Sequence, residues 1–136
     1  MCDIKFRAWE KNLKEMISVD SINFEAGLIN MELAWRTFEE IELMQYTGLK
    51  DKKDVEIYEG DVVKFYARSH YHPEVYAWEY ETKGVGIIRY EMGSYVLGGR
   101  EETYILESLF GVLMNYEDVK MEVIGNIYEN PELVED

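Results

Sequence analysis

The sequence is divided into many short runs in which apolar and polar residues alternate, with turn-forming residues between the runs. Residues 4–9 (IKFRAW) show this pattern, and residues 121–128 (MEVIGNIY) show it again near the other end of the chain. Alternation with a period of two places every second side chain on the same face of a strand. No long amphipathic helix interrupts these runs. The pattern therefore predicts a mainly β protein, a small antiparallel barrel or sandwich built from hairpins around a single core.

Glycine and polar residues mark the expected turns. Gly27 can adopt the positive φ of a tight hairpin, and Gly60 with Asp61 forms a turn before the valine-rich run at 62–63. Residues 50–54 (KDKKD) form a charged tip that we expect to be exposed as a surface loop. The predicted hairpins are residues 4–9 with 16–19, 22–24 with 28–29, and 85–90 with 95–97, and the charged tip separates strand regions at 43–49 and 55–66.

Three segments are less regular. Residues 33–43 mix helical and strand-like spacing, and we predict a strand from Ile41 onward. Residues 68–83 lack clear periodicity and are predicted to form an excursion from the sheet. Residues 104–106 are a possible strand, and 109–114 are either a short strand or a helical turn. Near the end of the chain, Asn130 followed by Pro131 is typical of a helix N-terminus, so a short C-terminal helix is expected.

The chain is strongly acidic, with 28 Asp and Glu against 14 Lys and Arg. The excess lies mainly in residues 69–136, which carry 14 acidic and only 4 basic residues. Because nucleic-acid phosphates are bound by Lys and Arg, this negative charge argues against direct nucleic-acid binding. Salt screens charge repulsion beyond about 8–10 Å, so a local basic patch could still bind an anion.

The sequence has none of the signals of a membrane or secreted protein. No run approaches the 18 to 20 apolar residues of a membrane span, and the first residues lack the apolar segment of a secretory signal. Cys2 is the only cysteine, so neither an intrachain disulfide nor a cysteine zinc cluster is available. We expect a location in the cytoplasm of a bacterial host cell.

Three segments, in this order and spacing, resemble the YopX family of phage and prophage proteins: residues 4–9, residues 43–63, and residues 122–133 (EVIGNIYENPEL). The resemblance spans nearly the whole chain. It implies one YopX-like domain over 1–136, with an N-terminal hairpin region at about 1–42 and a small SH3-like barrel at about 43–136. It implies an accessory protein of a phage or prophage and no assigned catalytic residues. The tip differs from the family pattern, since Lys53 and Asp54 replace the usual Asn-Gly, and residues 68–118 show little similarity.

Few residues suggest a chemical site. His70 and His72 could share one strand face and bind a divalent metal, but a solvated loop is the better interpretation of two histidines without further ligands, so no metal site is predicted. Adjacent acids such as Glu101 and Glu102 are common in so acidic a chain and indicate a solvated face. No nucleotide-binding or nucleophile motif is present, so neither catalytic residues nor a cofactor are predicted.

Two sets of residues remain as candidates for other roles. Gly60, Asp61, Gly125 and Asn126 are interpreted as structural turns. The aromatic segment that includes Tyr76, Trp78 and Tyr80 carries more aromatic surface than a loop needs, and we predict that it contacts a partner.

These observations predict a non-enzymatic module that binds a host or phage protein or associates into a homo-oligomer. In a narrower version of this hypothesis, the acidity imitates nucleic acid and occupies a DNA-binding protein. The alternative is a small β-barrel that binds nucleic acid, for which Lys50, Lys52 and Lys53 are the basic cluster in the sequence. A hydrolase with paired carboxylates has the least support.

Overall fold

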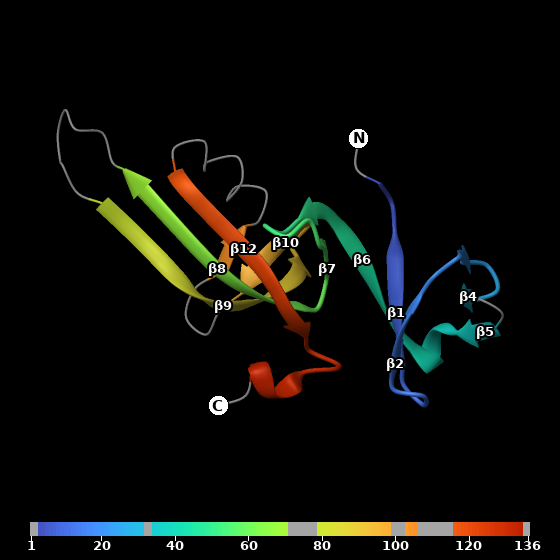
Figure 1. The fold of residues 1–136 in the computed structure, drawn as a ribbon. Coiled ribbons are helices and arrows are strands. Elements are labelled where there is room, and N and C mark those ends of the chain that lie inside the picture. The colour runs from blue at the N-terminus through green and yellow to red at the C-terminus, as the bar shows by residue number, and fades with distance from the viewer. Residues whose placement is uncertain (1–2, 32–33, 71–78, 99–102, 106–115, 135–136) are drawn as a thin grey trace.

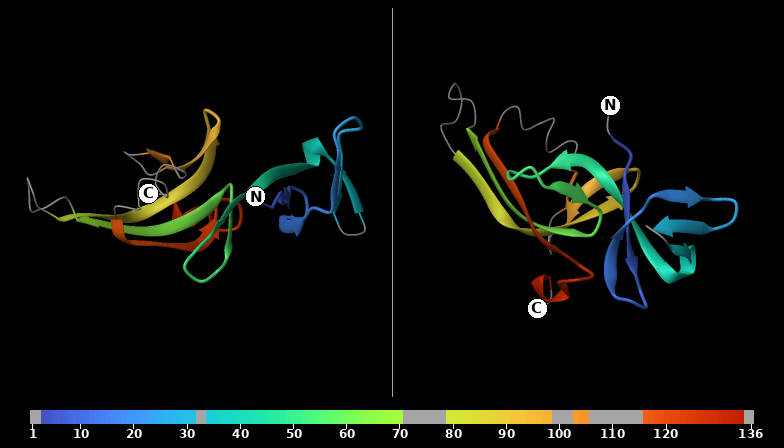
Figure 2. Two further views of the ribbon diagram at one scale, coloured as in Figure 1. Left: turned by 90° about the horizontal axis from the view of Figure 1, so that it is seen from above. Right: turned by 45° about the vertical axis from the view of Figure 1, so that its right-hand side comes forward.

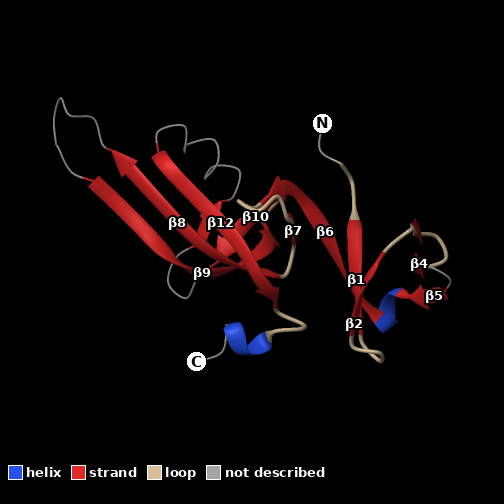
Figure 3. Ribbon diagram, viewed as in Figure 1, coloured by secondary structure: helices blue, strands red, loops and turns tan. Residues whose placement is uncertain are grey.

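The computed structural model describes residues 3–31, 34–70, 79–98, 103–105 and 116–134. Within these residues nearly all regular structure is β-strand, and the helical elements are single 3-10 turns (Figure 3). The prediction of a mainly β fold is confirmed. The elements are β1 (Phe6–Glu10), β2 (Glu15–Ser18), β3 (Ser21–Asn23), β4 (Leu28–Met31), β5 (Ala34–Thr37), η1 (Phe38–Glu40), β6 (Ile41–Lys50), β7 (Glu56–Tyr58), β8 (Asp61–His70), β9 (Glu79–Glu91), β10 (Ser94–Gly98), β11 (Thr103–Ile105), β12 (Tyr116–Asn126) and η3 (Pro131–Leu133).

The described strands form three antiparallel sheets. Their orders are β2-β1-β6-β7, β3-β4-β5 and β11-β10-β9-β8-β12. The five-stranded sheet curls into a half-barrel, and the N-terminal strands project away from it, so the molecule has two parts joined through β6 (Figures 1 and 2). An SH3-like topology for the half-barrel stays a prediction.

Each part has its own hydrophobic core, where the sequence suggested a single one. The N-terminal core is formed by Ala8, Ile29, Met31 and Ile41. The half-barrel core is formed by Ile57, Val63, Ile88, Leu97 and Met121. The inward-facing side chains of the N-terminal strands pack together in one layer, and those of the half-barrel strands pack together in another. Two small cores therefore form.

Strand β6 belongs to both parts. Leu43 packs on the N-terminal core and Leu49 on the half-barrel core, while Met44 and Tyr46 between them are buried. The strand pairs with β1 at its start, where Ala8 is opposite Leu43, and with β7 at its end, where Lys50 is opposite Glu56. A boundary between residues 42 and 43 therefore falls inside a continuous strand.

Most expected hairpins are present in the N-terminal part. β1 pairs with β2, and β3 pairs with β4. A strand does begin at Ile41, as predicted, but the preceding segment also contains β5, which the sequence analysis missed. Its four residues, AWRT, show no apolar-polar alternation, and Phe38 in the following 3-10 turn adds an apolar residue at helical spacing from Trp35.

The C-terminal part differs from expectation in two places. The predicted excursion over 68–83 is shorter, because β8 continues to His70 and β9 begins at Glu79. The predicted C-terminal helix is only the 3-10 turn η3, which buries no residue. The Asn130 side chain does not cap this turn, because its Oδ1 lies 3.3 Å from the backbone N of Asn126 and accepts that hydrogen bond instead. Without a cap or a buried face, little stabilises further turns of helix.

The predicted hairpin at 85–97 is present as β9 and β10, joined by a two-residue turn. Met92 and Gly93 form the turn between Glu91 and Ser94, and their φ values are 50° and 82°. Positive φ at both central residues characterises a type I′ turn, which favours Asn-Gly. Met92 is a long side chain in a left-handed conformation and is fully exposed.

The charged tip contains one buried carboxylate, contrary to the prediction of a fully exposed loop. Asp51 is only 8% exposed. Its Oδ1 accepts hydrogen bonds from the backbone N–H groups of Lys53 and Val55, at 2.8 and 2.9 Å, and its Oδ2 accepts one from Val123 at 2.9 Å. The Lys52 N–H also donates to Met121 O. Burial disfavours the Asp51 carboxylate, but the three N–H donors outweigh it and hold the Asp51 pKa below its ordinary value of 3.8. The tip thus covers the free edge of β12.

Met92→Asn is expected to raise the free energy of unfolding by about 0.5–1 kcal/mol, because asparagine tolerates the left-handed conformation better than methionine. Urea denaturation followed by circular dichroism measures the change. Met92→Ala is the control, since alanine retains the strain at Cβ. A gain of the same size in both variants would contradict the turn as the cause.

Asp51→Asn should lower the free energy of unfolding at pH 7 by about 1–3 kcal/mol, because the new amide cannot accept the Val123 N–H bond. A group with a lowered folded pKa stabilises the protein above its unfolded pKa and loses that effect as the pH falls through the folded value. The difference between the two proteins should therefore shrink below about pH 4. Urea titrations across pH measure it.

Asp54→Asn is the matched control for this experiment. Asp54 lies in the same loop, but its side chain is 83% exposed. Its unfolding midpoint should equal that of the native chain. Equal losses in both variants would show that Asp51 acts only through loop charge.

Candidate functional site

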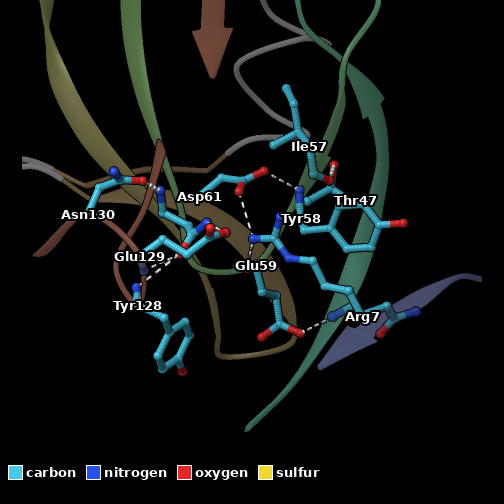
Figure 4. A network of polar contacts seen from close by, with 11 residues as sticks. Arg7, Thr47, Ile57, Tyr58, Glu59, Asp61, Tyr128, Glu129 and Asn130 are labelled. Atoms are coloured by element: carbon cyan, nitrogen blue, oxygen red, sulfur yellow. Dashed lines mark hydrogen bonds and ion pairs between the residues drawn. The ribbon is translucent and has the colours of Figure 1, made fainter. Parts of the chain in front are cut away.

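The two parts of the molecule meet at a polar cluster around Arg7, on β1 (Figure 4). Arg7 Nη2 lies 2.6 Å from Asp61 Oδ1 and 3.2 Å from the carbonyl oxygen of Glu59, and it donates to both. The guanidinium carbon lies 4.7 Å from the centre of the Tyr58 ring, within the range of a cation–π contact. The N-terminal sheet is thereby attached to the turn between β7 and β8.

Gly60 and Asp61 build the half-barrel side of this cluster. Gly60 has φ +83°, and a Cβ there would lie 3.2 Å from Met44 Sδ. Its N–H donates to Ile88 O, and its carbonyl accepts from Ile127 N. Asp61 Oδ2 accepts the Tyr58 N–H at 2.8 Å. The glycine allows the chain to turn closely against β6, and the aspartate then closes the turn.

Gly125 and Asn126, predicted as a turn, are the last residues of β12, and the turn follows them at residues 127–129. Asn126 Oδ1 accepts from the N–H groups of Tyr128 and Glu129, at 3.0 and 2.8 Å. A Cβ on Gly125 would lie 2.5 Å from Asn130 Oδ1, so a larger residue would displace that side chain. The Tyr128 ring stacks on Trp9 at a centroid distance of 5.7 Å, which gives a second contact between the two parts.

The cluster has little capacity for chemistry of its own. Burial raises the pKa of Asp61, while Arg7 and the Tyr58 N–H oppose that rise. Both oxygens of Asp61 already accept hydrogen bonds from these groups. Among the buried side-chain nitrogen and oxygen atoms of the described residues, only Nε of Arg7 has no hydrogen-bond partner. We therefore assign the cluster a structural role at the junction.

The other sequence candidates are only partly described. His70 ends β8, and His72 lies outside the described residues. The described part of the chain contains no group of three or more His, Cys, Asp or Glu side chains placed to hold a metal. Tyr76 and Trp78 also lie outside the described residues. Tyr80 lies on β9 opposite Ser69, and only its backbone is described. The predicted contact role of this segment stays a prediction.

The β3-β4-β5 sheet carries an exposed aromatic surface that the sequence analysis did not identify. In the β3-β4-β5 sheet, Ile29 and Met31 face the N-terminal core, so alternation places Leu28 and Trp35 on the opposite face. Trp35 is 53% exposed. At the end of the sheet where β3 turns into β4, Phe24 and Phe38 form an edge-to-face pair with centroids 6.4 Å apart. We call Leu28 and Trp35, together with the Phe24–Phe38 pair at the end of the sheet, the aromatic face.

A sequence signal for this face existed but was ambiguous. The four residues Ala34–Thr37 alternate in burial, with Trp35 and Thr37 exposed. In the sequence, however, Trp35 and Phe38 lie three residues apart, as on a buried helix face. Only the pairing of β5 with β4, in which Trp35 is opposite Asn30, shows that the tryptophan faces away from the core.

A family profile and a solved structure both match nearly the whole chain. A profile of the family described as YopX protein matches residues 5–135. The chain belongs to the YopX family. No curated protein matches the sequence. Among solved structures, the crystal structure of protein EF1440 from Enterococcus faecalis is similar, with a TM-score of 0.63 and 28% identity, over 99% of this chain and 100% of that one.

Membership of the YopX family names no activity. None of the helices among the described residues is long and apolar enough to cross a membrane.

Arg7→Lys should lower the free energy of unfolding by about 1–2 kcal/mol, because an ammonium cannot bond Asp61 and Glu59 O while also covering the Tyr58 ring. Lys5→Met is the control. Lys5 pairs with Glu56 at 2.6 Å and also joins the N-terminal segment to β7, but this pair is exposed and should contribute nothing measurable. Urea denaturation compares the variants, and equal losses would contradict a special role for the junction.

Proposed function

We propose that this YopX protein is a non-enzymatic binding module whose aromatic face docks on a basic surface of another protein. The observation that carries the proposal is the exposure of Trp35 on a sheet face turned away from the core. Tryptophan buries a large area with few rotatable bonds, and it is enriched among residues that dominate the energy of protein interfaces.

The surroundings of the face supply the second part of the proposal. Residues 20–42 contain six acidic residues and a single base, Arg36. Arg36 Nε lies 3.8 Å from Glu40 Oε2, so this base is already paired with an acid. An exposed tryptophan in so acidic a segment complements a partner that presents an apolar patch among Lys and Arg.

The negative charge also argues against self-association, which the sequence analysis predicted as the alternative to a different protein partner. A second copy would bring an identical acidic segment against the first, and each chain carries a formal net charge of −14. Repulsion of like charges disfavours such a dimer. A different, basic protein is therefore the proposed occupant. A role in a phage or prophage, as expected from the family resemblance, is consistent with a host protein as that partner.

Photo-crosslinking tests the proposal directly. A photoreactive phenylalanine derivative is placed at position 35 and, as a control, at position 90. Tyr90 is 54% exposed, close to the 53% of Trp35, but lies on the half-barrel. In a lysate of the native host cell, position 35 should capture one basic protein that position 90 does not capture.

The captured protein is then purified and titrated against the variants. Trp35→Ala should weaken its binding more than about tenfold, Tyr90→Ala should leave it unchanged, and added salt should weaken it. Circular dichroism and urea denaturation check that both variants fold. Crosslinking of position 35 to a second copy of the chain, or equal capture by both positions, would contradict the proposal.

A further inference from the structure

A pocket of about 310 Å³ lies on the half-barrel, away from the aromatic face and the junction. Residues of β8, β9 and β12 and of the tip that covers β12 line it. The lining residues are Lys52, Lys64, Phe65, Tyr66, Gly84, Val85, Lys120, Met121 and Glu122. The volume is at the small end of the range found for small-molecule sites, about 300–1,000 Å³.

The strand register places several of these side chains on one face of the sheet. Lys64 is opposite Glu122 on β12 and opposite Val85 on β9, and Tyr66 is opposite Lys120. Because residues two apart along a strand share a face, these five side chains form one continuous patch. We call this patch, together with Lys52, the lysine pocket.

The lysine pocket is basic although the chain is strongly acidic. Its single carboxylate, Glu122, is already held by Lys52 at 3.3 Å and by Lys53 at 2.7 Å. The two lysines hold the pKa of Glu122 below its ordinary value. Lys64 and Lys120 are exposed, and no carboxylate of the described residues lies within ion-pair distance of either. Two positive charges without an ion-pair partner among the described residues therefore border the pocket.

Apolar surface lies between these charges. Val85 is 45% exposed, and Tyr66 adds an aromatic ring beside Lys120. Pockets that combine lysine ammonium groups with aromatic and apolar surface suit ligands with a flat apolar body and an attached anion, in the manner of single-strand binding grooves. Lysine binds phosphate as a point charge and needs no fixed geometry to do so.

We propose that the lysine pocket binds a nucleotide, with Lys64 and Lys120 on its phosphate and the base against Tyr66 and Val85. A phosphate monoester carries about two negative charges at neutral pH. Such a small ligand meets the local lysines within a screening length of about 8–10 Å, whereas a long duplex would also meet the acidic remainder of the surface. A free nucleotide and the end of a short single strand present the same chemistry.

Isothermal titration of the full chain tests the proposal with four probes: AMP, adenosine, inorganic phosphate, and a short single-stranded oligodeoxyadenylate with a 5′ phosphate. AMP should bind more tightly than adenosine or phosphate, because each of those carries only half of the recognised chemistry. Tighter binding of the oligonucleotide than of AMP would identify a strand end as the source, and the reverse would identify a free nucleotide.

The double variant Lys64→Ala with Lys120→Ala should weaken binding of AMP or the oligonucleotide at least about tenfold. The double Arg variant at the same positions should restore it. Lys14→Asn is the matched control: Lys14 is an exposed lysine on the N-terminal part, and asparagine tolerates its φ of 54°. It should bind as the native chain does. Urea denaturation checks that all variants fold.

Three outcomes would overturn the proposal. The first is the absence of binding to both AMP and the oligonucleotide. The second is binding of phosphate alone as tightly as AMP, which would leave only an anion site. The third is binding that the double alanine variant does not change. Each of these outcomes leaves the proposed docking of a protein on the aromatic face untouched, because Trp35 lies on the other part of the molecule.

Discussion

The contact between Arg7 and Asp61 adds a polar connection between the two parts that strand β6 already joins. A buried ion pair gains little net free energy, because both charges lose their hydration when they are buried. Here the aspartate also closes the turn before β8, and the guanidinium also covers the Tyr58 ring. The pair therefore specifies how β1 meets the half-barrel, a role for which its geometry matters more than its strength.

This junction has a consequence for the surfaces of the protein. With two cores, the three-stranded sheet β3-β4-β5 packs on one side only, so its other face carries Trp35 in solvent. The half-barrel has its own exposed face, on which Lys64 and Lys120 lie. The aromatic face and the lysine pocket belong to different parts of the molecule, so neither surface covers the other.

The comparison of expectation with structure is most instructive at the tip, residues 50–54. Its five charged residues correctly predicted a loop between strands, but they also predicted that the whole loop is exposed, whereas Asp51 is buried. A carboxylate can be buried when backbone N–H groups satisfy it, and one of its three donors, Val123, is 72 residues away in the chain. No local pattern reports such a donor. Lys64 and Lys120 are also far apart in the sequence, and only the pairing of β8 with β12 brings them to one face.

By itself, the sequence determined what depends on neighbours along the chain: the mainly β character, most hairpins, and the glycine turn at Gly60. Strand alternation and turn chemistry act over a few residues and can be read directly. Only the tertiary structure decided that there are two cores, that β6 serves both, and that η3 is one 3-10 turn. It also decided which side chains share a face, because strand pairing over long separations sets which residues meet, and a shift of one residue would exchange the faces.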